Sequence, residues 1–257
     1  MGDGGHRSTL GPVRRGRWLA VVTAMITVAS ATAACGSNGQ GPTPSAFAGQ
    51  SASDILHLAL RNAMRADDVV FSIKTSGATQ QTVDGATGAA GGYEVVSSPE
   101  GQVHIEVIGP TAYIASPAEG LVATMGMTQA VAEANAGRWI SVKSSDQPFP
   151  QLSQALSFKS LLDEFTPGGT LHLSFTKFGA RTVGLVIGSG TAAQAVKSFH
   201  VELAVSATTP ELPVGAVLQI SANGNTVTQT AVFAQWGKPV TLETPPGAVT
   251  WDSVVPQ

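Results

Sequence analysis

Apolar and polar residues alternate in a long series of short runs between residues 69 and 233, and this alternation limits the possible folds most strongly. Successive side chains of a β-strand point to opposite faces, so each run predicts a strand with one apolar face. Ten such strands are predicted, at 69–75, 93–97, 103–107, 112–115, 139–143, 171–175, 183–187, 199–205, 214–220 and 226–233.

Turn residues between the runs favour antiparallel pairing of neighbouring strands. Asn223-Gly224 separates two alternating runs, and Asn-Gly in that position is the strongest short-range signal for a β-hairpin. Gly109-Pro110 breaks another run. The most secure structural prediction is therefore the hairpin between 214–220 and 226–233.

Three segments have helical spacing instead of alternation. The first helix is predicted to begin at Ser53, as N-cap before Asp54. The others are expected within 118–135 and 150–165, the latter with Leu152, Leu156 and Phe165 at helical spacing. Many alternating strands with a few blocks of helix predict an α+β fold with an antiparallel sheet.

The N-terminus has the parts of an export signal. Arg14, Arg15 and Arg17 precede an uncharged apolar run over 18–34, which ends in small residues. We therefore predict a signal peptide at 1–34. A single membrane span is the alternative, although the run is shorter than the roughly 20 apolar residues that a span needs. The arginine pair leaves Sec and Tat export both open.

Cys35 is the only cysteine in the chain, so it has no partner for an internal disulfide. The polar, glycine-rich tract after it offers no core in which a thiol could be buried. Thr32-Ala33-Ala34-Cys35 resembles the bacterial lipobox, with Thr32 where leucine is usual. The resemblance implies diacylglycerol on Cys35, an anchor whose two chains suffice for stable attachment. It places the mature protein on the extracytoplasmic face of the cell membrane, in the cell envelope.

The composition of the mature chain excludes one class of partner. Removing 1–34 leaves ten of the 14 basic and sixteen of the 17 acidic residues, a net charge of about −6. Nucleic-acid binding needs a clustered positive face and is not expected. We predict a flexible tether at 35–51 and a single domain at 52–257.

No catalytic or metal-binding pattern is present. His104, His172 and His200 each occupy the polar phase of a predicted strand, without the close spacing of metal ligands. There is no G-x-S-x-G elbow and no phosphate-binding glycine loop. We expect no enzyme activity, no cofactor and no metal.

Several short motifs carry a family resemblance through their order along the chain. They are Val107-Ile108-Gly109, Ala112-Tyr113-Ile114, Gly137-Arg138-Trp139-Ile140, Leu212-Pro213-Val214, the Asn-Gly hairpin, the segment 233–240 and Pro245-Pro246. Together they resemble the LppX/LprAFG-type lipoproteins of mycobacteria and related actinobacteria. The resemblance implies a half-barrel like that of LolA and LolB, a curved antiparallel sheet with helices packed on its concave face. Some members of that family hold diacylated or triacylated lipids in the resulting cavity and help to move them through the cell envelope. The resemblance therefore implies that this chain binds an acyl lipid or glycolipid.

The apolar strand faces supply candidate residues for such a cavity. They are Phe71, Ile73, Leu173, Phe175, Leu203, Leu218 and Phe233. Acyl chains would enter because apolar area leaves water. The alternative is that the same side chains close into a packed core, since protein interiors leave few voids. Two functions therefore stay open, a lipid carrier or an anchored structural or interaction module without a small ligand.

Overall fold

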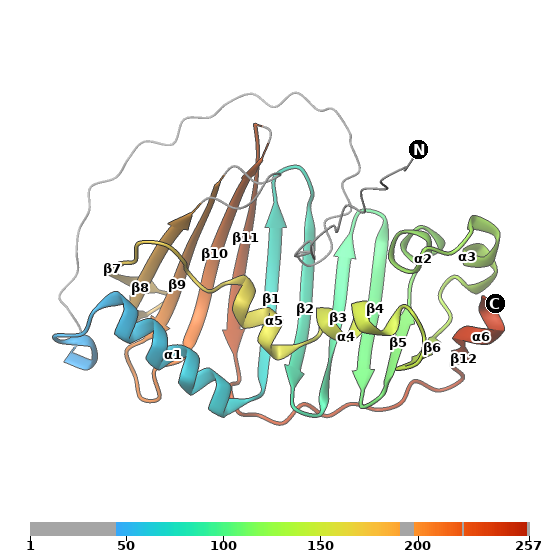
Figure 1. Cartoon of the computed structure of the whole chain (residues 1–257), viewed down its shortest axis with the longest axis horizontal. Helices are drawn as coiled ribbons and strands as arrows, with labels where there is room; N and C mark the ends of the chain where they lie inside the picture. The colour runs from blue at the N-terminus through green and yellow to red at the C-terminus, as the bar shows by residue number, and fades with distance from the viewer. Residues whose placement is uncertain (1–44, 191–197, 223, 256–257) are drawn as a thin grey trace, which may run out of the picture. The chain divides into compact units, whose positions relative to one another are not determined.

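The computed structural model describes residues 45–190, 198–222 and 224–255, and its strands form one twelve-stranded sheet (Figure 1). The sheet order is β12-β6-β5-β4-β3-β2-β1-β11-β10-β9-β8-β7. Every neighbouring pair is antiparallel except β12 and β6. The strands are β1 (Val69–Ser76), β2 (Gln81–Gly88), β3 (Gly91–Ser98), β4 (Gly101–Ile108), β5 (Thr111–Ala115), β6 (Ile140–Lys143), β7 (His172–Phe178), β8 (Arg181–Gly190), β9 (Ser198–Ser206), β10 (Pro213–Ala222), β11 (Asn225–Ala234) and β12 (Val249–Thr250).

The path of the chain explains why helices cover one face of this sheet. Strands β1 to β6 run from the middle of the sheet to the position next to one edge strand, β12, and β7 forms the opposite edge. The segment between β6 and β7 must therefore cross a face, and it carries α4 (Phe149–Ala155) and α5 (Phe158–Glu164). Strands β7 to β11 then return to the middle, where β11 pairs with β1.

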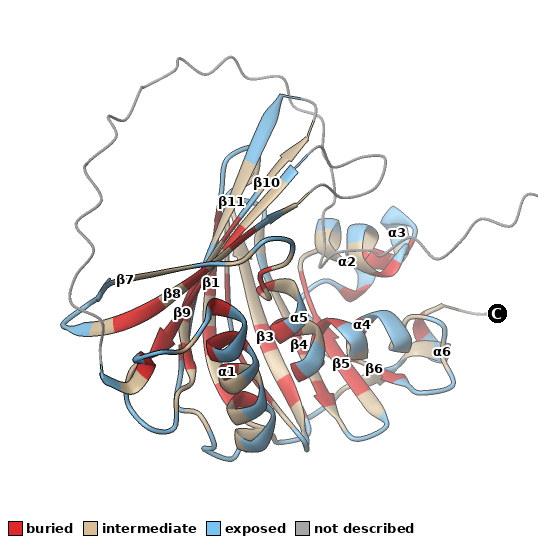
Figure 2. Cartoon of the chain, turned by 60° about the vertical axis from the view of Figure 1, so that its left-hand side comes forward, coloured by how far each residue is buried: buried red, intermediate tan, exposed pale blue. Residues whose placement is uncertain are grey.

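Helix α1 (Ala52–Ala66) lies on the same face as α4 and α5, and the sheet curves around these helices (Figure 2). It contacts β8, β9 and β10, whereas α4 contacts β4 and β5. Strand β7 and the short β12 form the two edges, so the sheet does not close. The predicted α+β fold with an open, curved antiparallel sheet is confirmed.

The first helix begins two residues earlier than predicted. Its N-cap is Ser51, not Ser53, because Ser51 and Asp54 form a capping box. The Ser51 hydroxyl accepts a hydrogen bond from the Asp54 amide, and the Asp54 carboxylate accepts one from the Ser51 amide. These bonds satisfy two backbone donors that a helix start otherwise leaves open.

Both other predicted helical segments are divided in two. In 118–135, Gly126 takes a left-handed conformation and ends α2 (Ala118–Met125) before α3 (Gln129–Asn135) begins. In 150–165, Ser157 caps a new helix, α5, directly after α4. A short α6 (Trp251–Val254) follows β12.

All ten predicted strands are present, and β10 and β11 form the predicted hairpin, with Ala222 paired to Asn225. Asn223 itself lies outside the described residues. Strands β2 and β12 were missed, because the sequence QTVDGATG of β2 has few apolar side chains and β12 has only two residues.

A short 3-10 turn, η1 (Ser45–Phe47), precedes α1 within the predicted tether. Phe47 is 1% exposed and stacks on Phe175 at a centroid distance of 6.1 Å. A Cβ atom on Gly184 would lie 2.9 Å from Cε2 of Phe47, so the glycine makes room for the ring.

Cys35 and the predicted signal peptide lie outside the described residues, and no helix among those described is long and apolar enough to cross a membrane.

Candidate functional site

The strand register brings all seven candidate cavity residues to the face that the helices cover. One row of paired residues crosses six strands, in the order Ile73, Ala231, Ala216, Leu203, Val186 and Leu173. Phe71 pairs with Phe233 two positions along, while Leu218 and Phe175 lie two positions from the row on their own strands. Residues two apart on a strand share a face. We refer to this surface as the inner face.

Most of these residues are packed rather than open to solvent. Phe71, Ile73, Leu203, Leu218 and Phe233 are between 2% and 6% exposed and belong to the main apolar core. Leu173 and Phe175 are half-buried against that core. Helices α1 and α5 supply the opposing side chains, among them Ile55, Ala59, Leu161 and Phe165. The middle of the inner face is therefore a packed interior.

Aromatic side chains hold the centre of this interior together. The ring of Phe233 lies 5.9 Å from that of Phe165 and 6.1 Å from that of Trp236, measured between centroids. Phe158 of α5 meets Trp236 edge to face. On the neighbouring strand, Phe71 lies over Gly85, where a Cβ atom would come 2.7 Å from Cζ of the Phe71 ring.

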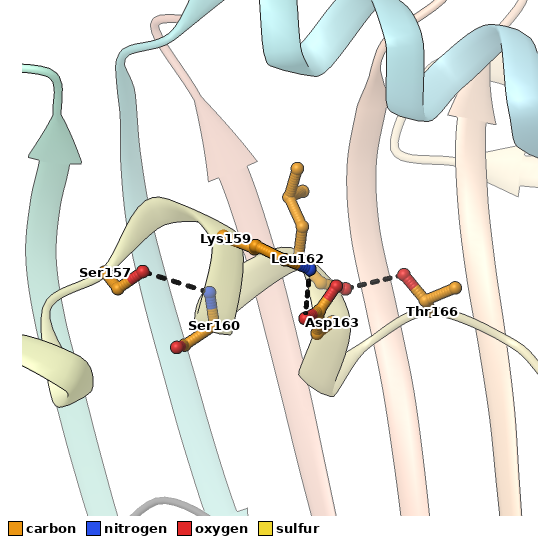
Figure 3. Close-up of polar contacts among 6 residues, drawn as sticks. All are labelled: Ser157, Lys159, Ser160, Leu162, Asp163 and Thr166. Carbon is orange, nitrogen blue, oxygen red and sulfur yellow. Dashed lines mark hydrogen bonds and ion pairs between the residues drawn. The ribbon is translucent and has the colours of Figure 1, made fainter.

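Helix α5 is held in position by local polar contacts (Figure 3). The hydroxyl of Ser157 accepts a hydrogen bond from the amide of Ser160 at the helix start. At its end, the hydroxyl of Thr166 donates to the carbonyl oxygen of Leu162. Lys159 and Asp163 form an exposed ion pair at 2.7 Å, which contributes little because both groups are solvated. These contacts orient Leu161 and Leu162 toward the core, where both are buried.

The helices do not cover the whole inner face. At the end of the sheet that carries the β1–β2, β3–β4 and β10–β11 turns, the apolar surface of the inner face continues beyond the core. Four apolar side chains there are only half-buried: Val96, Leu171, Phe199 and Ile220. Phe199 and Ile220 face each other on β9 and β10. In Figure 1, β10 and β11 extend beyond α1 and α5 toward this end. We refer to these four residues as the apolar rim.

A groove opens the helix layer at the other end of the strands. It has a volume of about 390 Å³ and lies between the end of α1, the β2–β3 turn and the junction of α4 and α5. Val107, Leu156 and Phe158 provide apolar lining, and Asp67 and Lys159 provide charged groups. Its volume is within the range of small-molecule sites, about 300–1,000 Å³. None of the seven candidate cavity residues lines it.

A second groove of about 520 Å³ lies on the opposite face. It is formed by β5, β6 and the segment 244–248, with Tyr113, Ser141 and Lys143 among its lining residues. The pairing of Tyr113 with Ser141 places both on the outer face of the sheet. This groove is therefore separate from the inner face.

Sequence reasoning missed three polar residues of the inner face. Thr75 is 4% exposed and Glu94 is 1% exposed, and both are surrounded by apolar strand positions. Gln229 lies opposite Thr75 and also opposite Leu218. For Thr75 and Gln229 the sequence did hold a signal of this position, because both residues continue the alternation of the inward-facing side chains of β1 and β11.

The three strand histidines, His104, His172 and His200, lie on the outer face of the sheet. His200 is hydrogen-bonded to the Ser189 hydroxyl at 2.8 Å through Nδ1 and to the Glu202 carboxylate at 3.1 Å through Nε2. Serine, histidine and glutamate are the residue types of a hydrolase triad. This trio lies on the outer face of β8 and β9, and neither groove includes it. Among the described residues, no group of histidines and acids could hold a metal ion.

Comparisons with known proteins identify similar structures but no relative by sequence. No protein-family model matches the chain, and no curated protein is significantly similar to it. The structure is similar to that of the Mycobacterium tuberculosis lipoprotein LppX, with a TM-score of 0.46 and 13% identity over 75% of this chain and 100% of that one. It is also similar to an uncharacterized conserved protein of Thermus thermophilus, with a TM-score of 0.41 and 10% identity over 78% and 98% of the two chains.

Proposed function

We propose that this protein is a membrane-anchored lipoprotein of the cell envelope that binds an acyl lipid or glycolipid on the inner face and assists its transport. The observation that carries the proposal is the incomplete cover of that face. Its apolar surface continues past the helices into the half-buried rim, and a groove opens the helix layer at the opposite end. A hydrocarbon chain laid on the rim would remove further apolar area from water, at about 25 cal/mol per Å².

The alternative, an anchored interaction module without a small ligand, is favoured by a different observation. Five of the seven candidate cavity residues are packed against α1 and α5. The proposed lipid site therefore excludes the middle of the inner face. It uses the rim, together with Leu173 and Phe175, which are half-buried.

Photolabelling distinguishes the two functions. The full chain is produced in a host that lipidates it, and membranes are illuminated in the presence of a monoacylglycerol that carries a photoreactive group on its acyl chain. We expect labelled peptides from β7, β9 and β10, at the rim, and noncovalently bound lipid in organic extracts. Labelling that a rim variant, Ile220→Asp, leaves unchanged, together with an extract free of lipid, would establish the interaction module.

The anchor is tested separately. We expect metabolic incorporation of an alkyne-bearing palmitate into the wild-type chain and none into the Cys35→Ser variant, because the thioether needs the sulfur. The mass of the N-terminal peptide should show that the mature chain begins at Cys35. An unlabelled wild-type chain that keeps residues 1–34 would instead support a single membrane span.

A further inference from the structure

Two polar atoms on the inner face are buried without a hydrogen-bond partner in the structure. They are Oγ1 of Thr75 on β1 and Oε1 of Gln229 on β11. The two residues are directly paired across the strands, so their side chains leave the sheet side by side on the same face. A buried polar atom without a partner loses its hydration and gains nothing in return. The pair therefore has unused hydrogen-bonding capacity at one point of an apolar surface.

The surroundings of the pair connect it to the proposed lipid site. Ile73 is its apolar neighbour toward the core on β1, and Leu218 lies directly opposite Gln229 on β10. Val227 and Ile220 form the next paired row toward the hairpin end, and Ile220 belongs to the apolar rim. A chain lying on the rim would thus bring its polar end within one row of Thr75 and Gln229.

The charges nearby restrict the chemistry of that polar end. Strands β1, β2, β10 and β11 contain one basic residue, Lys74, which alternates with Thr75 and points to the outer face. No cation on these four strands is available for a phosphate or carboxylate on the inner face. A neutral head group is therefore favoured.

Hydrogen-bonding capacity selects one neutral group. The threonine hydroxyl can donate or accept, whereas the amide oxygen of Gln229 only accepts. A ligand hydroxyl can donate to the amide oxygen and accept from Thr75 at the same time. A ligand hydroxyl also fits if the side-chain amide of Gln229 is turned by 180°, because the hydroxyl then accepts a hydrogen bond from the amide nitrogen.

Building on the proposed function, we propose that Thr75 and Gln229 bind a hydroxyl group of a neutral acyl lipid whose chain lies along the apolar rim. These two residues then determine specificity, by distinguishing a lipid with a free hydroxyl from the same lipid with that hydroxyl blocked. The rim supplies affinity that does not depend on the head group.

The test uses two photoreactive monoacylglycerols that differ only in their glycerol hydroxyls, free in one and methylated in the other. The lipidated full chain is labelled with each probe, alongside a Thr75→Val/Gln229→Met double variant and a Thr230→Val control. Thr230 is exposed and lies next to Gln229 on the outer face. Both substitutions in the double variant preserve shape and remove buried polar atoms, so a melting temperature no lower than that of the wild type verifies folding.

We expect the wild type and the control to prefer the free-hydroxyl probe by about tenfold, as two neutral hydrogen bonds would give. In the double variant the preference should disappear, while labelling by the methylated probe stays the same. A preference that persists in the double variant, or a wild type that labels equally with both probes, overturns the role of Thr75 and Gln229 but leaves lipid binding intact. A wild type that neither probe labels overturns both this role and the proposed function.

Discussion

Truncating Phe233 to alanine gives the most direct measure of how tightly the inner face is packed. The side chain is 4% exposed, it contacts the rings of Phe165 and Trp236, and it lies opposite Phe71. Removing it leaves a void between the sheet and α5 that no single neighbour can fill. Substitutions of this kind cost about 3–5 kcal/mol. For a chain of this length the loss corresponds to a fall of about 10 °C in melting temperature.

The assay is equilibrium urea unfolding followed by tryptophan fluorescence, with Trp236 as a local reporter. Val232→Ala is the matched control, because Val232 is the adjacent residue on β11 and its side chain is 43% exposed on the outer face. We expect the control to change the free energy of unfolding by about 0.5 kcal/mol or less. If Phe233→Ala lowers the free energy of unfolding by less than about 1 kcal/mol, or by no more than the control does, the description of the centre of the inner face as a packed interior is wrong.

Three further predictions concern local features. Gly85→Ala should destabilise the fold by about 1–3 kcal/mol in urea unfolding, since the new methyl group would overlap the backbone carbonyl oxygen of Tyr93 and the Phe71 ring. An unchanged midpoint contradicts this. Hydrogen bonds from Ser51 lower the pKa of Asp54, so the stability that Asp54 contributes is present above its unfolded pKa of about 3.9 and is lost as the pH falls through the lower folded value. The melting temperature of Asp54→Asn should therefore lie below that of the wild type at pH 7 and approach it in acid. A difference in melting temperature that stays constant with pH contradicts this. Burial raises the pKa of Glu106, so the stability that the protonated side chain contributes is present below about pH 4.3 and is lost as the pH rises through the folded pKa. Glu106→Gln should therefore have a higher melting temperature than the wild type at pH 7. In strong acid this difference should disappear.

The strands and the face that each side chain occupies could be predicted because alternation is a property of the local sequence. The phase of Phe71 and Ile73 within β1 determined which residues share a face, and the register then aligned them with Leu203 and Leu173. Helix boundaries were less predictable, since they depend on single capping side chains. Ser157 starts a second helix inside an apolar pattern that reads as continuous.

The extent of cover could not be predicted, because it depends on where the segment between β6 and β7 crosses the sheet. Leu218 and Ile220 have the same phase and similar chemistry, yet the first is buried and the second half-buried. The buried polar atoms of Thr75 and Gln229 could not be predicted for the same reason. A polar residue in the apolar phase of a strand can be recognised as a candidate site residue only once its burial is known. Local sequence thus indicates which side chains face inward, and the crossing segment decides which of them remain available.

If Cys35 carries the proposed lipid anchor, the burial of Phe47 beside Gly184 limits how far the domain can move from the bilayer. Nine residues lie between Cys35 and Ser45, where η1 begins, and the ten Cα–Cα steps that join these two residues span at most about 35 Å. The proposed anchor would therefore confine the domain to a layer of about this depth above the membrane surface. A donor or acceptor of the proposed lipid ligand would then have to come within that layer, and residues inserted between Cys35 and Ser45 would widen the range over which the ligand could be passed on.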